Sequence, residues 1–179
     1  MLRYTPGMGA SLLVSEQEYL TTSYEPECEF DNGKLLARNT GELPHSLLMT
    51  AVACFLHERA RQHRIQVLPI LRIRIGSGRY RVPDVCVYKQ PAPRDPIPNR
   101  PPFIAIEILS PEDRMSRVRT KIDEYLAFGV PYVWLIDPQR RRADVYTASG
   151  FYEAKDGVLR TEDPAIEVPL AELFQALDD

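Results

Sequence analysis

The chain contains the stretch Phe103-Ile104-Ala105-Ile106-Glu107-Ile108-Leu109, in which every residue except Glu107 is apolar. A continuous apolar run of this length, bounded by Pro102 and Pro111, is typical of a strand that is buried on both faces. Glutamate is almost never fully buried unless it is paired or bound to something. Without a partner, burial would keep the Glu107 carboxyl group protonated, whereas a nearby cation, most simply a divalent metal, would let it stay charged.

A second acid, Asp84, occurs inside another apolar stretch, Val82-Pro83-Asp84-Val85-Cys86-Val87. The turn Gly76-Ser77-Gly78 is expected to lead the chain into the strand that carries this acid. Two carboxylates on neighbouring central strands can hold Mg²⁺ through oxygen ligands. Asp84 and Glu107 are therefore the first candidates for a metal site.

Length and composition indicate an ordinary globular protein. At 179 residues, with 44% apolar and 26% charged residues, the chain can bury a substantial core, and we expect one domain over residues 1–179. No apolar run approaches the length of a bilayer span, and the N-terminus lacks the apolar core of a signal peptide. Three widely spaced cysteines favour reduced core residues over a disulfide framework or a zinc site. We expect a cytoplasmic protein without a membrane partner.

The charges are unevenly distributed along a chain whose net charge is -3. The segment from Arg59 to Arg81 contains seven arginines and no acid, whereas the segment from Thr161 to Asp179 contains six acids and no base. This asymmetry favours a polyanionic partner on one side of the molecule. The alternative is that these charges lie on solvated helix and strand faces.

Local signals predict the N-terminal elements. A capping box that begins at Ser15 predicts a short helix over residues 15–23. The tight-turn signal Asp31-Asn32-Gly33 predicts a β-hairpin over residues 27–38. Apolar residues at helical spacing predict a long amphipathic helix from His45 to about His63.

The rest of the chain alternates between predicted strands and helices. Residues 67–75 alternate as in a strand, and residues 90–102 hold six prolines and form an irregular loop. The Glu107 strand is followed by a helix from Ser110 to about Phe128 and by the apolar strand 132–136, a unit that implies one parallel pair with a right-handed crossover. Shorter strands are expected over residues 145–151 and 164–168, and a terminal helix over 169–177. The prediction is an α/β fold: a mixed β-sheet flanked by α-helices, with an N-terminal helix and β-hairpin.

Lys121 is one of four lysines in a chain whose other basic residues are arginines. It lies on the helix directly after the Glu107 strand, flanks the apolar stripe of that helix, and could reach back to the strand end. Metal-assisted hydrolysis of a phosphodiester needs carboxylates to hold the metal and benefits from a lysine that orients water and stabilises charge on the phosphoryl oxygens.

Several segments, in a fixed order, carry a resemblance to a known family. They are Glu29-Phe30-Asp31-Asn32-Gly33-Lys34, His45, Pro83-Asp84, Glu107-Ile108-Leu109-Ser110-Pro111, Lys121, Tyr125, Gly129-Val130, and Tyr132-Val133-Trp134-Leu135-Ile136-Asp137-Pro138. The pair Pro83-Asp84 with Glu107 resembles the PD-(D/E)xK nuclease motif, and the whole set, over roughly residues 15–150, resembles the Uma family of restriction endonucleases.

The resemblance implies a restriction-endonuclease-like fold and an endonuclease that depends on Mg²⁺, with Mn²⁺ as a substitute. It implies that Asp84, Glu107 and the backbone carbonyl of Ile108 bind the metal, with Asp84, Glu107 and Lys121 as the catalytic set. The lysine expected two residues after the glutamate is Leu109 here, and Lys121 matches the place of a lysine on the following helix. Arg117 stands where family members often carry an acid, which adds positive charge beside Lys121.

Glu29 and His45 are auxiliary candidates, since an inward-pointing Glu29 could brace Lys121 or a second metal. Nucleic acid, in the first instance DNA, is the expected partner. The residues expected to contact its phosphates are Arg72, Arg74, Arg79 and Arg81, because guanidinium groups bind phosphate in bidentate geometry. Two-fold homodimers are the commonest oligomers, so we expect a homodimer.

Each candidate also has a structural explanation. Asp84 could cap a bulge after Pro83, Glu107 could pair with a buried arginine, and Lys121 could lie on the surface. Glu29 could be exposed on the hairpin and His45 could be a surface residue at a helix start; Tyr125 and Trp134 are expected in the core. The alternative functions are a nucleic-acid-binding protein with little or no cleavage, and an oligomeric scaffold.

Overall fold

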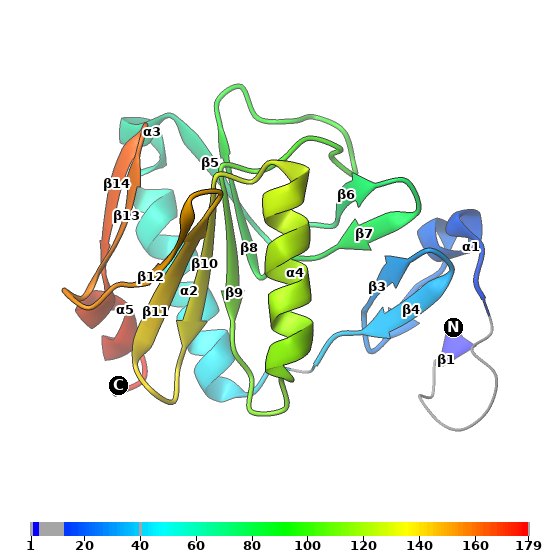
Figure 1. Cartoon of the computed structure of the whole chain (residues 1–179), viewed down its shortest axis with the longest axis horizontal. Helices are drawn as coiled ribbons and strands as arrows, with labels where there is room; N and C mark the ends of the chain where they lie inside the picture. The colour runs from blue at the N-terminus through cyan, green and yellow to red at the C-terminus, as the bar shows by residue number, and fades with distance from the viewer. Residues whose placement is uncertain (1, 4–12, 40, 179) are drawn as a thin grey trace.

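The computed structural model describes residues 2–3, 13–39 and 41–178. In these residues six strands form a central mixed sheet (Figure 1). Its order is β12 (Gly150–Glu153), β11 (Arg142–Thr147), β10 (Tyr132–Asp137), β9 (Ile104–Ile108), β8 (Val85–Lys89) and β5 (Ile65–Pro69). β9 and β10 are parallel and are connected through helix α4 (Met115–Phe128), while the other neighbouring pairs are antiparallel. The expected strand–helix–strand unit is therefore confirmed.

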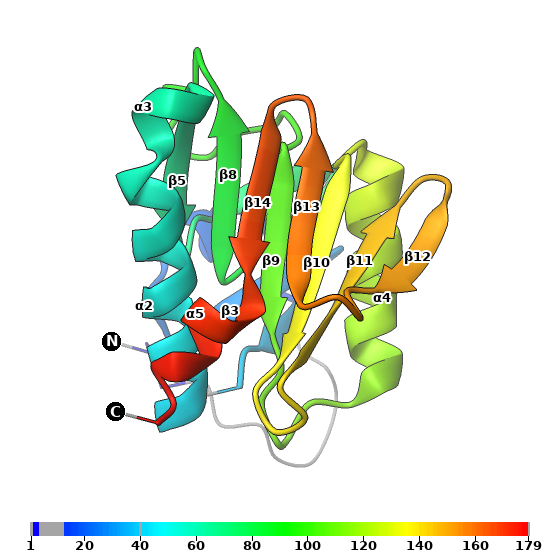
Figure 2. The same cartoon turned by 90° about the vertical axis from the view of Figure 1, so that its left-hand side faces the viewer.

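The central sheet is covered on both faces. Helix α4 packs on one face (Figure 1). Figure 2 shows the other face, which carries the long helix α2 and a hairpin with a short helix. The elements on that side are α2 (Leu43–Glu58), α3 (Ala60–His63), β13 (Val158–Glu162), β14 (Ala165–Pro169) and α5 (Leu170–Gln175). β13 was not among the predicted strands.

A smaller sheet lies beside α4 in Figure 1. Among the described residues it has four strands in the order β4 (Lys34–Ala37), β3 (Cys28–Asp31), β7 (Arg79–Arg81) and β6 (Ile73–Gly76). The predicted hairpin is β3–β4, and its turn uses left-handed backbone at Asn32 (φ 47°) and Gly33 (φ 91°). Helix α1 (Glu16–Thr21) is capped by the Ser15 side chain as predicted; β1 (Leu2–Arg3) pairs with β2 (Tyr24–Glu25).

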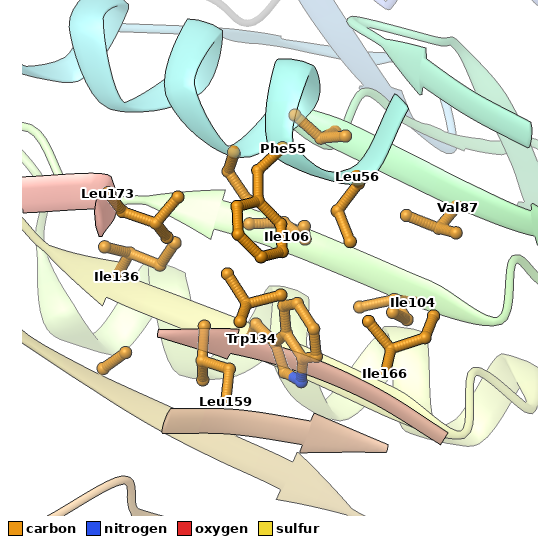
Figure 3. Packing of buried hydrophobic residues seen from close by; sticks show 14 of the residues in the cluster. Phe55, Leu56, Val87, Ile104, Ile106, Trp134, Ile136, Leu159, Ile166 and Leu173 are labelled. Carbon is orange, nitrogen blue, oxygen red and sulfur yellow. The ribbon is translucent and has the colours of Figure 1, made fainter. Parts of the chain in front are cut away.

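Strand β9 alternates between the two layers. Ile104, Ile106 and Ile108 face the α2 layer, where they pack with Trp134 and Phe55 (Figure 3). Ala105 belongs to the cluster on the α4 side, so the two-residue period of the strand points Glu107 toward α4. The strand is thus an apolar core element on one face and carries an acid on the other.

Four predicted elements differ from the structure. The helix expected from His45 to about His63 is divided at Arg59 into α2 and α3, and the strand expected over residues 145–151 is the two strands β11 and β12 joined by a turn. Residues 67–75 are not one strand: β5 ends at Pro69, Ile70 takes a left-handed conformation (φ 50°), and β6 belongs to the smaller sheet. The helix expected to begin at Ser110 begins at Met115, because the Asp113 side chain accepts the Ser110 N–H (2.8 Å) and closes a turn first. That helix ends at Gly129 as predicted (φ 100°).

None of the helices in residues 13–39 and 41–178 combines the length and the apolar character that a membrane crossing requires.

Replacing Ile106 by Ala is expected to lower the free energy of unfolding by about 2–5 kcal/mol, since it leaves a cavity between β9 and the α2 layer. Ile106 is fully buried (0% exposed), whereas Leu43 at the start of α2 is 72% exposed. The matched control Leu43→Ala should change the same quantity by less than about 0.5 kcal/mol. Equal losses in urea unfolding of the two variants would contradict this description of the core.

Candidate active site

The two acids singled out in the sequence meet in one cavity on the α4 side of the central sheet. Asp84 directly precedes β8, and Glu107 is on the neighbouring strand β9. Both line a small cavity of about 60 Å³. Its other lining residues are Glu29, Arg38, Asn39, His45, Ile108, Leu109, Ser110, Asp113, Arg117, Val118, Lys121 and Leu135.

Asp84 is buried (3% exposed) and its carboxylate is held by three donors. Arg38 Nη2 lies 2.8 Å from Oδ1, while the Ile108 N–H donates to Oδ2 at 2.8 Å and His45 Nε2 lies 3.2 Å from the same oxygen. Burial acts to raise the pKa of Asp84, but the hydrogen bond from His45 and the charges of His45 and Arg38 outweigh it and lower that pKa. Asp84 is therefore an ionised carboxylate in a fixed orientation.

Glu107 is held by two side chains of α4. Lys121 Nζ lies 2.8 Å from Oε2, and the Tyr125 hydroxyl donates to Oε1 at 2.7 Å. Lys121 and Tyr125 are four residues apart, so they share one face of the helix. Burial raises the pKa of Glu107 to about 7; Lys121 opposes this shift, and the negative charges of Asp84 and Glu29 add to it.

Lys121 bridges two carboxylates. Besides Glu107, its Nζ lies 3.0 Å from Oε1 of Glu29, which is 1% exposed. Burial alone would lower the pKa of Lys121, but the charges of Glu107 and Glu29 raise it. Lys121 therefore stays protonated in the cavity and is not a surface residue.

Glu29 points inward from β3. It accepts the Val82 N–H at 3.0 Å as well as the contact from Lys121. Burial acts to raise its pKa, yet Lys121, Arg81 and the Val82 N–H lower it below the ordinary value. Of the two uses considered for an inward-pointing Glu29, the structure has the contact that braces Lys121.

His45 lies near the start of α2 and faces Asp84 across the cavity. The hydrogen bond to Asp84 raises the pKa of the imidazole, although burial and the charge of Arg38 oppose the shift. His45 thus helps to orient the Asp84 carboxylate.

The four arginines expected to bind phosphate lie on and next to the smaller sheet, and none of them lines this cavity. For Arg81 the structure differs from the predicted phosphate contact. The residue is 2% exposed, and its guanidinium donates to the Glu124 carboxylate at 2.7 and 2.9 Å. It also donates to the Phe30 and Tyr80 carbonyls. A guanidinium so enclosed cannot reach a phosphate on the surface.

The other three arginines are partly exposed and have partners within the protein. Arg79 contacts Asp31 (3.1 Å), Arg74 contacts Glu16 (3.2 Å), and Arg72 lies over the ring of Tyr19. Their expected phosphate contacts stay predictions.

Sequence reasoning missed two residues of the site. Tyr125 is buried as expected, but its hydroxyl contacts Glu107; its spacing of four residues from Lys121 could have indicated this. Arg38 follows the β3–β4 hairpin, and its neighbours in the sequence give no signal that it reaches Asp84.

The donor set fits a hard divalent cation. The carboxylates of Asp84 and Glu107 line one cavity, and the charge of Asp84 contributes to the raised pKa of Glu107, so a further cation there would be stabilising. Across residues 13–39 and 41–178, no three His, Cys, Asp or Glu side chains gather closely enough to hold a metal by themselves. Mg²⁺ commonly takes one or two carboxylates and keeps several waters, which suits this pocket.

Comparison with known proteins agrees with this fold. A crystal structure of a "putative nuclease" of the family DUF820, from Anabaena variabilis ATCC 29413, is similar with a TM-score of 0.80 and 24% identity, over 92% of this chain and 99% of that chain. This similarity confirms the expected α/β fold. A model of the Uma2 family, described as "putative restriction endonuclease", matches residues 16–177. The chain belongs to the Uma2 family, as its sequence motifs indicated.

Two further comparisons contribute little. A cryo-EM structure of a DrdV–DNA complex aligns with a TM-score of 0.41 and 14% identity, over 72% of this chain and 10% of that chain. No curated protein matched the sequence.

The raised pKa of Glu107 predicts how the stability of the metal-free protein depends on pH. Between the ordinary value of 4.5 and about 7, folded Glu107 holds a proton that the unfolded chain has lost, so this group makes stability fall as pH rises. In EDTA, Glu107→Gln should therefore gain stability relative to the wild type between pH 5 and pH 8, by at most about 1.4 kcal/mol per pH unit. Denaturant unfolding at several pH values measures this difference. If the free energies of unfolding of the two proteins changed with pH in parallel, the prediction would be wrong.

Proposed function

We propose that the protein is a Mg²⁺-dependent endonuclease that hydrolyses phosphodiester bonds in nucleic acid. The observation that carries this proposal is the shared cavity of Asp84 and Glu107 with Lys121 beside them. Such a set of carboxylates and a lysine is what metal-assisted hydrolysis requires. Membership in a family described as "putative restriction endonuclease" supports the same conclusion.

Asp84, Glu107 and the backbone carbonyl of Ile108 would hold the metal. Mg²⁺, or Mn²⁺ in its place, would polarise the scissile phosphate and lower the pKa of the attacking water. The protein contributes orientation: His45 and the Ile108 N–H fix the Asp84 carboxylate, and the Tyr125 hydroxyl fixes Glu107.

Lys121 acts as a donor and not as a base. The charges of Glu107 and Glu29 hold its pKa above the ordinary value, so its Nζ stays protonated at neutral pH. From that position it can donate to the water or to a phosphoryl oxygen and stabilise the negative charge that develops there. Glu29 keeps the ammonium in place from the other side.

We propose DNA as the substrate. The family description supports a DNA-directed enzyme, and Arg117 lines the cavity with an exposed side chain that could meet the backbone. Arg72, Arg74 and Arg79 are candidates for more distant phosphate contacts, on the condition that they release their partners in the protein. A two-fold homodimer would present one cavity to each strand of a duplex.

A second candidate is a nucleic-acid-binding protein that cleaves little or not at all. One observation favours it: protein donors occupy both oxygens of Asp84 and both oxygens of Glu107. A metal can bind only if some of these donors yield.

Cleavage assays separate the two candidates. Wild-type protein should cut plasmid or single-stranded DNA with Mg²⁺ or Mn²⁺ and lose this activity in EDTA. Asp84→Asn, Glu107→Gln and Lys121→Met should each reduce the rate by about 100-fold or more. Asp123→Asn, an exposed acid on the same helix as Lys121, is the matched control and should keep the rate.

The pattern of outcomes is decisive. Equal cutting by all variants would show a contaminating nuclease and contradict the proposal. DNA binding that persists in EDTA, with no product under either metal, would establish the second candidate instead.

A further inference from the structure

The two oxygens of Asp84 are held in different ways. Oδ2 accepts the Ile108 N–H at 2.8 Å and faces His45 Nε2 at 3.2 Å, so strand β9 and helix α2 both fix it. Oδ1 accepts a hydrogen bond from Arg38 Nη2 at 2.8 Å. Oδ2 thus orients the carboxylate, and Oδ1 is the oxygen from which one side chain can withdraw.

The Arg38 guanidinium is the positive charge that lies beside Oδ1 of Asp84. Its guanidinium compensates the charge of Asp84, and the charge of Asp84 in turn raises the pKa of Arg38 in spite of burial. A divalent metal on Oδ1 would compete with this guanidinium, because two cations cannot share one carboxylate oxygen at close range without strong repulsion. Binding of the metal therefore requires that Arg38 move.

The structure supplies a place for Arg38 to go. Its Nη1 already contacts Oε2 of Glu27 at 3.0 Å, and the Glu27 side chain is 41% exposed, toward the outside of the site. The Arg38 side chain is 18% exposed, so it lies at the edge of the cavity. A small rotation could exchange the contact with Asp84 for a closer one with Glu27 and solvent.

We propose that Arg38 is a positioning residue that holds Oδ1 of Asp84 in the metal-free protein and withdraws to Glu27 when a divalent cation binds. The inference rests on the proposed metal-dependent function and adds to it a competition within the protein. Before the metal binds, Arg38 keeps Asp84 ionised and oriented. Because its guanidinium competes for Oδ1, it also lowers the affinity of the site for the metal. The contact with Glu27 favours the conformation in which Arg38 has left Asp84.

The test is the affinity for Mn²⁺, measured by isothermal titration calorimetry without nucleic acid. Arg38→Met removes the competing cation and should tighten binding by about tenfold, the size of one charge-assisted hydrogen bond. Glu27→Gln should weaken binding several-fold, since Arg38 then keeps its contact with Asp84. In the double variant the Glu27→Gln substitution should have no further effect, because its influence passes through Arg38.

Arg117→Met is the matched control for a general change of charge. Arg117 also lines the cavity, but it donates to the Ala37 carbonyl and not to a carboxylate. Its replacement should change the Mn²⁺ affinity by less than about threefold, as expected for an exposed charge. An equal gain for Arg117→Met and Arg38→Met would reduce the effect to long-range electrostatics and overturn the inference.

Other outcomes separate this inference from the proposed function. If wild-type protein binds Mn²⁺, Asp84→Asn does not, and Arg38→Met binds more weakly than wild type, Arg38 has a structural role and the inference fails alone. Binding by Arg38→Met without binding by the wild type would support it in its strongest form. If no variant binds Mn²⁺, the metal site itself is contradicted and the inference fails with it.

Discussion

The structure of the site depends on one ionic arrangement: the Lys121 ammonium between the carboxylates of Glu107 and Glu29. Glu29, Asp84 and Glu107 all line one small cavity, and enclosing that much negative charge is costly unless cations compensate it. Lys121 and Arg38 supply part of the compensation. Burial, together with the charges of Asp84 and Glu29, still raises the pKa of Glu107 above its ordinary value, so a further cation beside it would be stabilising.

Regular secondary structure delivers these groups to one place. The period of two along β9 sends its isoleucines into the α2 layer and Glu107 toward α4. The period of the helix then brings Lys121 and Tyr125 to the two oxygens of that carboxylate. β8 runs antiparallel to β9, so Asp84, directly before the first residue of β8, lies within reach of the Ile108 N–H near the end of β9. The core and the site are therefore built by the same strand.

The central strand, the crossover helix and the site residues Asp84, Glu107 and Lys121 could be predicted, because each shows a pattern in its own stretch of sequence. An acid in an apolar run and a lysine beside an apolar stripe are visible without a structure. Arg38 could not be predicted, because its partner is 46 residues away and depends on how the small sheet sits against the large one. Arg81 was misjudged for the same reason, since a run of arginines does not show that Glu124 from α4 encloses one of them. The break at Ile70 likewise follows from tertiary pairing and not from the alternating pattern.

The central claim is that Asp84 and Glu107 jointly bind one divalent cation. A crystal soaked in Mn²⁺ and measured for anomalous scattering tests it most directly. We predict one peak bonded to oxygens of both carboxylates at roughly 2.0–2.2 Å, the range for a small octahedral cation, with Lys121 still beside Glu107. A fully soaked crystal with no peak between these carboxylates would contradict the account.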